Sequence, residues 1–345
     1  RDVMAVSLYP KEGNPLWEQY NTEVVAHTIK TYSKYTIDYE YPVAISVHTN
    51  QIGMEYPMIC FNGGRPEEDG TYSERTKYGM ISVIIHEVGH NFFPMIINSD
   101  ERQWTWMDEG LNTFIQYLTE VEWDPNYPSR RGNPQKIVDY MKGDQSNIAP
   151  IMTNSESIFQ FGNNAYGKPA TALNILRETI LGRELFDFAF KTYCERWAYK
   201  HPTPADFFRT MEDASGVDLD WFWRGWFFNT DPVDISLDEV QLFHLDTKDP
   251  KQELAFDKMV EDSQPPYLGD QRNAEIITKP VIEQKPELKD FYNKWDRYSP
   301  TAYDVKKYQE YLAKAEDDEK AMLAKGGYYY QMKFTNQGGL PMPII

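Results

Sequence analysis

Two histidines and a glutamate in the first third of the chain have the types and spacing of a metal site. His86 and His90 stand four residues apart, with Glu87 between them, in the apolar run 83–93. Four residues turn an α-helix by about 400°, so both imidazoles project from one face, one turn apart. At that separation each can form a bond of about 2 Å to one zinc ion. Histidines in apolar surroundings also need a polar partner, so the segment predicts a metal-binding helix.

A third candidate ligand, Glu109, follows His90 after 18 intervening residues. Those residues leave room for a turn and a returning helix, which would bring the carboxylate to face the histidine pair. Catalytic zinc usually has three protein ligands and one open position. We therefore expect one Zn²⁺ per chain, bound by His86, His90 and Glu109. The neighbouring Asp108 is expected at the surface, early in a helix, where an acid suits the helix dipole.

The position of Glu87 indicates what such a metal would be used for. His86–His90 has the H-E-x-x-H pattern, in which the glutamate is not a ligand but reaches a water on the metal. Zinc lowers the pKa of bound water towards about 7 and polarises a carbonyl. Glu87 can then take the proton of the water and return it to the leaving amine. The negative charge that develops on the carbonyl oxygen needs a further donor.

Periodicity predicts the elements that must hold these residues. Apolar residues at helical spacing predict a helix over 16–36, and β-rich runs predict strands over 42–48 and 56–61. A mostly helical stretch follows, and a change of pattern near residue 231 introduces two further strands separated by a charged helix. The later predicted elements are helices 74–93, 107–121, 134–142, 166–180, 184–199, 204–214 and 218–227, strand 235–245, helix 302–324 and strand 328–335. The two late strands could pair.

Composition narrows the possible partners. The 345 residues are 41% hydrophobic and carry a net charge of −18, which suits a globular protein and disfavours nucleic acid as a partner. Cys60 and Cys194 are too few for a disulfide framework and are expected to be buried thiols. No apolar run approaches the roughly 18 residues of a membrane span. The sequence does not indicate an oligomeric state.

The motifs together resemble the aminopeptidase N and leukotriene hydrolase family of gluzincin metallopeptidases. H-E-x-x-H is followed after 18 residues by Glu109 within W-x-x-E-G, and the resemblance extends over roughly residues 15–232. It implies an α+β fold, with a thermolysin-like catalytic domain of a small mixed sheet and a helical lobe over 1–232. Residues 233–345 would be a linker, a helical insertion and the truncated start of a C-terminal β domain.

The resemblance also implies roles for residues outside the metal motif. The family has a G-x-M-E-N motif on an edge strand, matched here by Ile52–Tyr56, with Ile52 and Tyr56 replacing the usual Gly and Asn. Glu55 would bind the free α-amino group of a peptide, and Gly53 and Met54 would line the peptide. Tyr166, before Gly167-Lys168, would donate to the oxyanion. The stretch from Leu181-Gly182 to Trp226 also resembles the family, and residues expected to pack in the helical lobe are Phe186, Tyr193, Asp206, Phe207, Trp221, Phe222 and Trp226.

The function implied is a zinc-dependent aminopeptidase acting on peptides with a free N-terminus. A thermolysin-like endopeptidase is an alternative, although an amine anchor at Glu55 favours an exopeptidase. Epoxide hydrolysis is disfavoured, because Ile158 and Phe161 stand where the leukotriene branch has Asp and Tyr. A non-catalytic peptide-binding relict of the fold is a third alternative.

Two expectations concern the parent protein. The chain begins at Arg1 without a methionine and ends in the apolar tail 338–345, which has the pattern of a strand cut short. We expect a fragment of a longer protein. A bacterial periplasm or cell-surface location is favoured over the cytoplasm.

Overall fold

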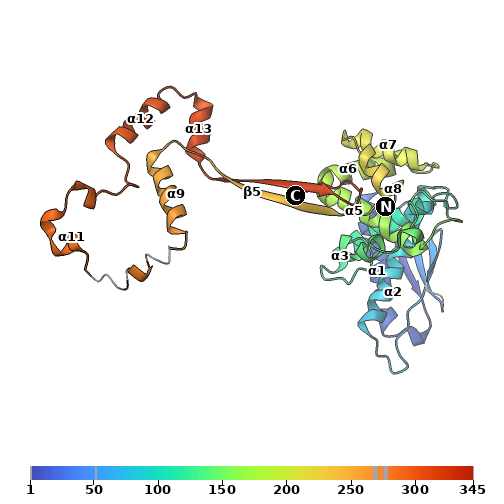
Figure 1. Ribbon diagram of the computed structural model, residues 1–345. Coiled ribbons are helices and arrows are strands. Elements are labelled where there is room, and N and C mark those ends of the chain that lie inside the picture. Colours follow the sequence, from blue (N-terminus) through green and yellow to red (C-terminus); the bar gives the residue numbers. More distant parts are fainter. Residues whose placement is uncertain (1, 51–52, 267–270, 274, 276–278, 345) are drawn as a thin grey trace. The chain divides into compact units, whose positions relative to one another are not determined.

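The computed structural model of the chain describes residues 2–50, 53–266, 271–273, 275 and 279–344. They form two compact units, residues 1–235 with 336–345, and residues 236–335. The domain boundary expected after residue 232 stays a prediction. All the candidate site residues lie in the first unit, whose strands and helices are coloured blue to yellow in Figure 1.

A four-stranded mixed sheet begins the first unit. The strand order is β1-β2-β4-β3, with β1, β2 and β4 parallel and β3 an antiparallel edge strand. The strands are β1 (Met4–Leu8), β2 (Val43–His48), β3 (Gly53–Tyr56) and β4 (Ile59–Asn62). Side chains of alternate residues point to one face of a strand, and those of Ala44, Ser46, Cys60 and Asn62 are buried.

The sheet differs from the sequence prediction in two ways. Strand β1 was not expected at all, and the single strand predicted over 56–61 is a hairpin. Pro57 suits the first central position of a tight turn, and Met58 takes the left-handed second position with φ of 68°. The chain therefore reverses after Tyr56. As a result Glu55 lies on an edge strand, in agreement with the resemblance.

The helices of the first unit agree with the predicted ones to within a few residues. They are α1 (Leu16–Tyr35), α2 (Glu74–Gly89), α3 (Leu111–Trp123), α4 (Val138–Met141), α5 (Lys168–Ile175), α6 (Arg183–Trp197), α7 (Pro204–Ser215) and α8 (Asp220–Phe227), with short helical segments η1 (Lys11–Gly13), η2 (Asn91–Ile96), η3 (Trp106–Gly110), η4 (Pro134–Lys136), η5 (Gln145–Asn147), η6 (Gly162–Gly167) and η7 (Leu176–Ile180).

Helix α2 is shorter than the predicted helix over 74–93. Its regular part ends at Gly89, and Phe93 has the non-helical backbone angles φ −128° and ψ 113°. Pro94 follows, and a proline disfavours helical geometry in the residue before it. His86 therefore lies in the last turn of α2, and His90 is the residue that caps this helix, where the chain turns away from it.

The core joins the sheet to the helical lobe. Helices α1 and α2 pack against strands of the sheet and against each other. In the lobe, buried aromatic side chains pack together, namely Phe186, Phe190, Tyr193, Phe207, Trp223 and Trp226. Trp106 joins this cluster, with its ring centroid 4.8 Å from that of Phe227. This packing fixes the segment that precedes Glu109.

Two residues expected to pack in the lobe do not. Trp221 is 37% exposed. Asp206 forms the capping box of α7 with Thr203, whose backbone N–H it accepts at 2.9 Å. The packing role expected for Phe186, Tyr193, Phe207, Phe222 and Trp226 is confirmed.

The second unit contains the two late strands and a run of helices. They are β5 (Ile235–His244), α9 (Pro250–Asp262), α11 (Val281–Gln284), η8 (Pro286–Leu288), η9 (Phe291–Asn293), α12 (Ala302–Leu312), α13 (Asp317–Lys325) and β6 (Tyr328–Asn336). The expected pairing of the strands is confirmed. Helix α9 was not expected, and the single helix predicted over 302–324 is two helices. Three acids in the first turn of α13 suit a new helix start at that point.

The apolar tail does not form the expected strand. Within residues 338–344 the chain is irregular, and Leu340 is buried against α8. A β-carbon at Gly225 would lie 2.4 Å from Leu340 Cδ1, so the glycine makes room for the leucine. The expected α+β class, with a small mixed sheet and a helical lobe, is confirmed. Among the described residues, no helix has both the length and the apolar character to cross a membrane.

Candidate metal centre and catalytic site

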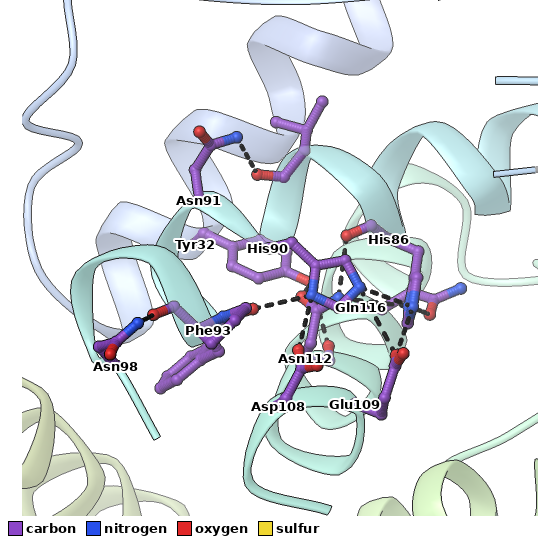
Figure 2. Close-up of polar contacts among 12 residues, drawn as sticks. Tyr32, His86, His90, Asn91, Phe93, Asn98, Asp108, Glu109, Asn112 and Gln116 are labelled. Carbon is purple, nitrogen blue, oxygen red and sulfur yellow. Dashed lines mark hydrogen bonds and ion pairs between the residues drawn. The ribbon is translucent and has the colours of Figure 1, made fainter. Parts of the chain in front are cut away.

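Two elements bring the three predicted ligands together. Helix α2 presents His86 and His90, and η3 presents Glu109 opposite them (Figure 2). Glu109 Oε2 lies 3.0 Å from His86 Nε2 and 3.5 Å from His90 Nε2, and the two Nε2 atoms are 3.1 Å apart. Zinc bonds of about 2 Å in a tetrahedron place neighbouring ligand atoms about 3.3 Å apart. The donor set and its spacing therefore fit one zinc ion.

The other ring nitrogen of each histidine already has a partner. His86 Nδ1 lies 2.9 Å from Gln116 Oε1, and His90 Nδ1 lies 2.9 Å from the carbonyl oxygen of Phe93. Both partners only accept hydrogen bonds, so each Nδ1 carries the proton and donates it. Nε2, which faces Glu109, is then the ring nitrogen that is left to bind a metal. Such partners fix the tautomer and orientation of metal-binding imidazoles.

A polar stripe that begins on η3 and continues along α3 supports this arrangement. Glu109 on η3 and Asn112, Gln116 and Glu120 on α3 recur at helical spacing and face α2. Asn112 Nδ2 donates to the carbonyl oxygen of His86 at 2.9 Å, and Gln116 Nε2 donates to Glu120 Oε1 at 2.9 Å. Sequence reasoning missed Asn112 and Gln116. The three- and four-residue spacing of polar residues in an apolar helix was the signal that could have identified them.

Helix α1 completes the same network. The hydroxyl of Tyr32, fully buried on α1, donates to Asn112 Oδ1 at 2.7 Å. A β-carbon at Gly89 would lie 2.3 Å from both that hydroxyl oxygen and Asn112 Oδ1. Only glycine therefore allows the three helices to approach this closely beside His90.

The carboxylates around His90 create a site that favours a cation. Asp108 is buried, with its Oδ1 2.9 Å from His90 Nδ1, so the expected surface position of Asp108 is wrong. Burial alone would lower the pKa of His90, but Asp108 and Glu109 raise it to about 10. Burial alone would raise the pKa of Glu109, but His86 and His90 lower it to about 2. The negative potential of these carboxylates suits a bound metal ion.

Glu87 is placed beside this cluster without joining it. Its side chain is buried, and burial raises its pKa to about 7. Its Oε2 atom has no hydrogen-bond partner among the described residues. A buried carboxylate oxygen without a partner is costly unless something absent from the protein itself, such as water or substrate, reaches it. A pKa near neutrality suits a group that both takes and returns a proton.

Tyr166 lies beside His86. It belongs to η6, immediately before α5, and its ring stacks on that of His86 with centroids 5.7 Å apart. Burial and the charge of Glu109 raise the pKa of Tyr166 above its ordinary value. The phenol therefore keeps its proton at neutral pH and can donate a hydrogen bond near the ligand cluster.

The edge strand β3 brings the remaining predicted residues to the site. A carboxylate oxygen of Glu55 and donor atoms of His90 and Asp108 lie within 4.8 Å of one another. Gly53 approaches Glu87, and the side chain of Met54 is exposed. Ile52, the first residue of the matched motif, lies outside the described residues. The structure thus brings all eight predicted site residues to one place.

Comparison with known proteins matches the chain to peptidases. The model of the Peptidase family M1 domain matches residues 20–226. The chain is 25% identical over 201 residues to probable aminopeptidase 2 of Sulfurisphaera tokodaii, covering 56% of this chain and 25% of that protein. It is 23% identical over 226 residues to aminopeptidase N of Lactococcus lactis, covering 59% and 25%.

A solved structure shows the same fold. The chain is similar to Legionella pneumophila aminopeptidase A, crystallised in complex with aspartic acid, with a TM-score of 0.54 and 15% identity. That match covers 70% of this chain and 31% of the other. The chain therefore spans about a quarter of the length of these two curated relatives, and less than a third of the solved chain.

Proposed function

The chain belongs to peptidase family M1, and we propose that it is a zinc-dependent aminopeptidase that removes N-terminal residues from peptides. The resemblance to the aminopeptidase N and leukotriene hydrolase family is confirmed at the level of the family. The roles of individual residues, one zinc per chain and the peptide substrate belong to the proposal.

The observation that carries the proposal is the arrangement of four side chains. His86, His90 and Glu109 present donor atoms 3.0–3.5 Å apart, and Glu87 presents a buried carboxylate oxygen without a partner beside them. Three ligands leave a fourth zinc position open, as catalytic zinc requires. Zinc bound there would supply Lewis acidity, polarising the scissile carbonyl and acidifying a water.

The chain's own residues would carry the proton transfers and hold the peptide. Glu87 accepts the proton of the attacking water and delivers it to the amine nitrogen of the residue that follows the scissile bond. The Tyr166 phenol, which keeps its proton, donates to the carbonyl oxygen as negative charge develops on it. Glu55 accepts hydrogen bonds from the ammonium group of the first residue, next to His90. The Gly53 backbone runs beside Glu87 and lines the peptide, with Met54 following on the edge strand.

The test gives the zinc-loaded protein one short peptide in two forms, free and N-acetylated, and follows the products by mass spectrometry. We expect only the free form to lose its first residue, because acetylation removes the charge that Glu55 binds. The control is Glu87→Gln, which keeps the shape of the side chain but cannot accept the proton and should be inactive.

Internal cleavage of both forms would favour the endopeptidase alternative and remove Glu55 from the proposed role. Zinc binding in a one-to-one ratio without any cleavage would favour a non-catalytic relict of the fold. Glu101, whose pKa is raised by burial and by the charge of Glu55, is the matched control, so Glu55→Gln is compared with Glu101→Gln. Only the former should abolish the preference for the free form.

A further inference from the structure

Two adjacent arginines line the cavity that leads from the metal ligands. The cavity has a volume of about 760 Å³, and Arg130 and Arg131 contribute to its wall together with His86, Glu87 and Tyr166. The guanidinium carbon of Arg131 lies 4.4 Å from the centroid of the Tyr166 ring. Stacking on the ring holds this cation beside the place where the peptide would react.

Neither arginine forms an ion pair. Among the described residues, no carboxylate lies within ion-pair distance of Arg130 or Arg131, whereas Arg102, Arg177 and Arg183 each have at least one. Burial lowers the pKa of Arg131 and the charge of Arg130 lowers it further, whereas Tyr166, Glu109 and Glu120 act in the opposite direction. Two close cations, one of them largely removed from water, favour an anion between them. The cavity wall holds three arginines, Arg75, Arg130 and Arg131, and two acids, Glu87 and Glu120.

The acids of the same cavity are already engaged. Glu120 accepts hydrogen bonds from Ser82 Oγ at 2.8 Å and from Gln116 Nε2 at 2.9 Å, and it is buried. Glu87 lies at the ligand cluster and has the proposed proton-transfer role. The arginines are therefore the groups of this wall that remain available to a ligand.

The direction of the cavity indicates which part of a peptide would reach it. Glu55 lies beside His90, but the cavity extends the other way along α2, from His86 through Ser82 to Arg75. Eleven helical residues span about 16 Å, the length of four or five extended residues. With the N-terminus of the peptide at Glu55, the residues after the scissile bond would lie in this cavity.

We infer that Arg130 and Arg131 bind a carboxylate on the leaving part of the peptide, either its C-terminal carboxylate or an acidic side chain. The inference rests on the proposed function, because the orientation of the peptide comes from Glu55 and the metal ligands. Since Arg131 stacks on Tyr166, the carboxylate belongs to one of the first residues after the scissile bond. Very short peptides, or peptides with Asp or Glu early in the chain, are then the preferred substrates.

The experiment compares peptides that differ only in charge. The zinc-loaded protein is given Ala-Ala-Ala and its C-terminal amide, and then Ala-Glu-Ala and Ala-Gln-Ala, both as amides. If the arginines bind the C-terminal carboxylate, the free acid should have the higher kcat/KM by about tenfold or more, the size of one charge-assisted hydrogen bond. If they bind an acidic side chain, the peptide with Glu should have the same advantage over the peptide with Gln. Because both peptides of a pair are cleaved by the same groups, the ratio of their kcat/KM values cancels any effect of the arginine substitutions that acts through Tyr166.

The variant Arg130→Gln/Arg131→Gln should bring the preferred ratio close to one. Arg209→Gln, which removes an exposed arginine from α7, should leave it unchanged. Equal cleavage of both members of both pairs by the unmodified protein would overturn the inference while leaving the proposed function intact. A preference that survives in the double variant would also overturn it.

A separate measurement covers the case in which no peptide is cleaved, which would count against the proposed function alone. The zinc-loaded Glu87→Gln protein is titrated calorimetrically with the same four peptides. Tighter binding of the carboxylate member by about tenfold, lost in the added Arg130→Gln/Arg131→Gln background, supports the inference. Equal dissociation constants within both pairs would overturn it.

Discussion

A β-carbon at Gly53 would lie 2.2 Å from Oε1 of Glu87, so the edge strand β3 and helix α2 meet at a point where only glycine fits. The same added carbon would lie 2.7 Å from Val83 Cγ2. This contact joins the strand that carries Glu55 to the helix that carries Glu87 and two of the proposed ligands. The proposed amine anchor and the proposed base are thus set in register by one residue without a side chain.

Gly53→Ala should therefore displace Glu87 or the strand and lower kcat by roughly 100-fold, since small misplacements of catalytic groups have effects of this size. Bound zinc should remain unchanged, because Gly53 does not contact the ligands. Turnover and metal content are measured on the same sample, so that a loss of kcat can be distinguished from a loss of zinc. As a stability control, Gly79→Ala adds a methyl group where nothing lies within 4 Å, and it should stabilise α2 by about 0.5–1 kcal/mol. A Gly53→Ala protein with normal kcat would show that the contact is not needed.

Gln116→Leu removes the acceptor that orients His86. Losing such a partner typically weakens metal affinity by about 10- to 100-fold. Competition with a zinc-binding dye measures the change, and Gln135→Leu, at an exposed position, is the matched control. Equal zinc affinity in Gln116→Leu and the control would mean that the hydrogen bond to His86 has no role in metal binding.

The helical lobe offers a matched pair of phenylalanines on α6. Phe190 is 1% exposed and contacts other rings of the aromatic cluster, whereas Phe188 is 60% exposed. Phe190→Ala should lower the free energy of unfolding by about 3–5 kcal/mol, from lost burial and the cavity left behind. Phe188→Ala should change it by less than about 0.5 kcal/mol. Urea denaturation of both variants measures the difference, and similar losses would contradict the packing described for the lobe.

Lys168 gives a prediction for pH dependence. It is fully buried, its Nζ donates to the carbonyl oxygen of Asn229 at 3.2 Å, and burial lowers its pKa to about 8. Between about pH 8 and 10.5 the unfolded chain still binds a proton that the folded chain has released. Folding stability due to this residue therefore rises with pH across that window.

The comparison is with Lys168→Met, which cannot titrate. From pH 7.5 to 10 the unmodified protein should gain roughly 2 kcal/mol of unfolding free energy relative to the variant. Urea midpoints at the two pH values give the difference. A constant difference between the two proteins would show that Lys168 has an ordinary pKa in the folded state.

The sequence brought out the proposed metal ligands because their chemistry requires a particular spacing along the chain. His86 and His90 must lie one helical turn apart, and Glu109 must return on a second helix. Both constraints appear in the sequence as a fixed number of residues between these positions. The helices were predictable for a similar reason, since α1, α6 and α7 each bury one face. The hairpin at Pro57-Met58 was missed because a continuous apolar run conceals a turn.

The burial and tertiary contacts of a residue were harder to predict than the helix or strand in which it lies. Asp108 resembles a surface acid at a helix start, and only the packing of Trp106 against the lobe shows that η3 is buried. Arg130 and Arg131 have no local pattern at all, because their relation to Tyr166 spans about 35 residues of sequence and depends on tertiary structure. Contacts of this kind are set by packing between elements rather than by spacing within one.

X-ray absorption at the zinc edge, on protein whose metal content has been counted, tests whether His86, His90 and Glu109 hold one zinc ion. We expect one zinc per chain with nitrogen and oxygen ligands at about 2.0–2.2 Å, and loss of the bound metal in Glu109→Ala but not in Cys60→Ser. A sulfur ligand at about 2.3 Å, or full retention of zinc in both Glu109→Ala and His90→Ala, would contradict it.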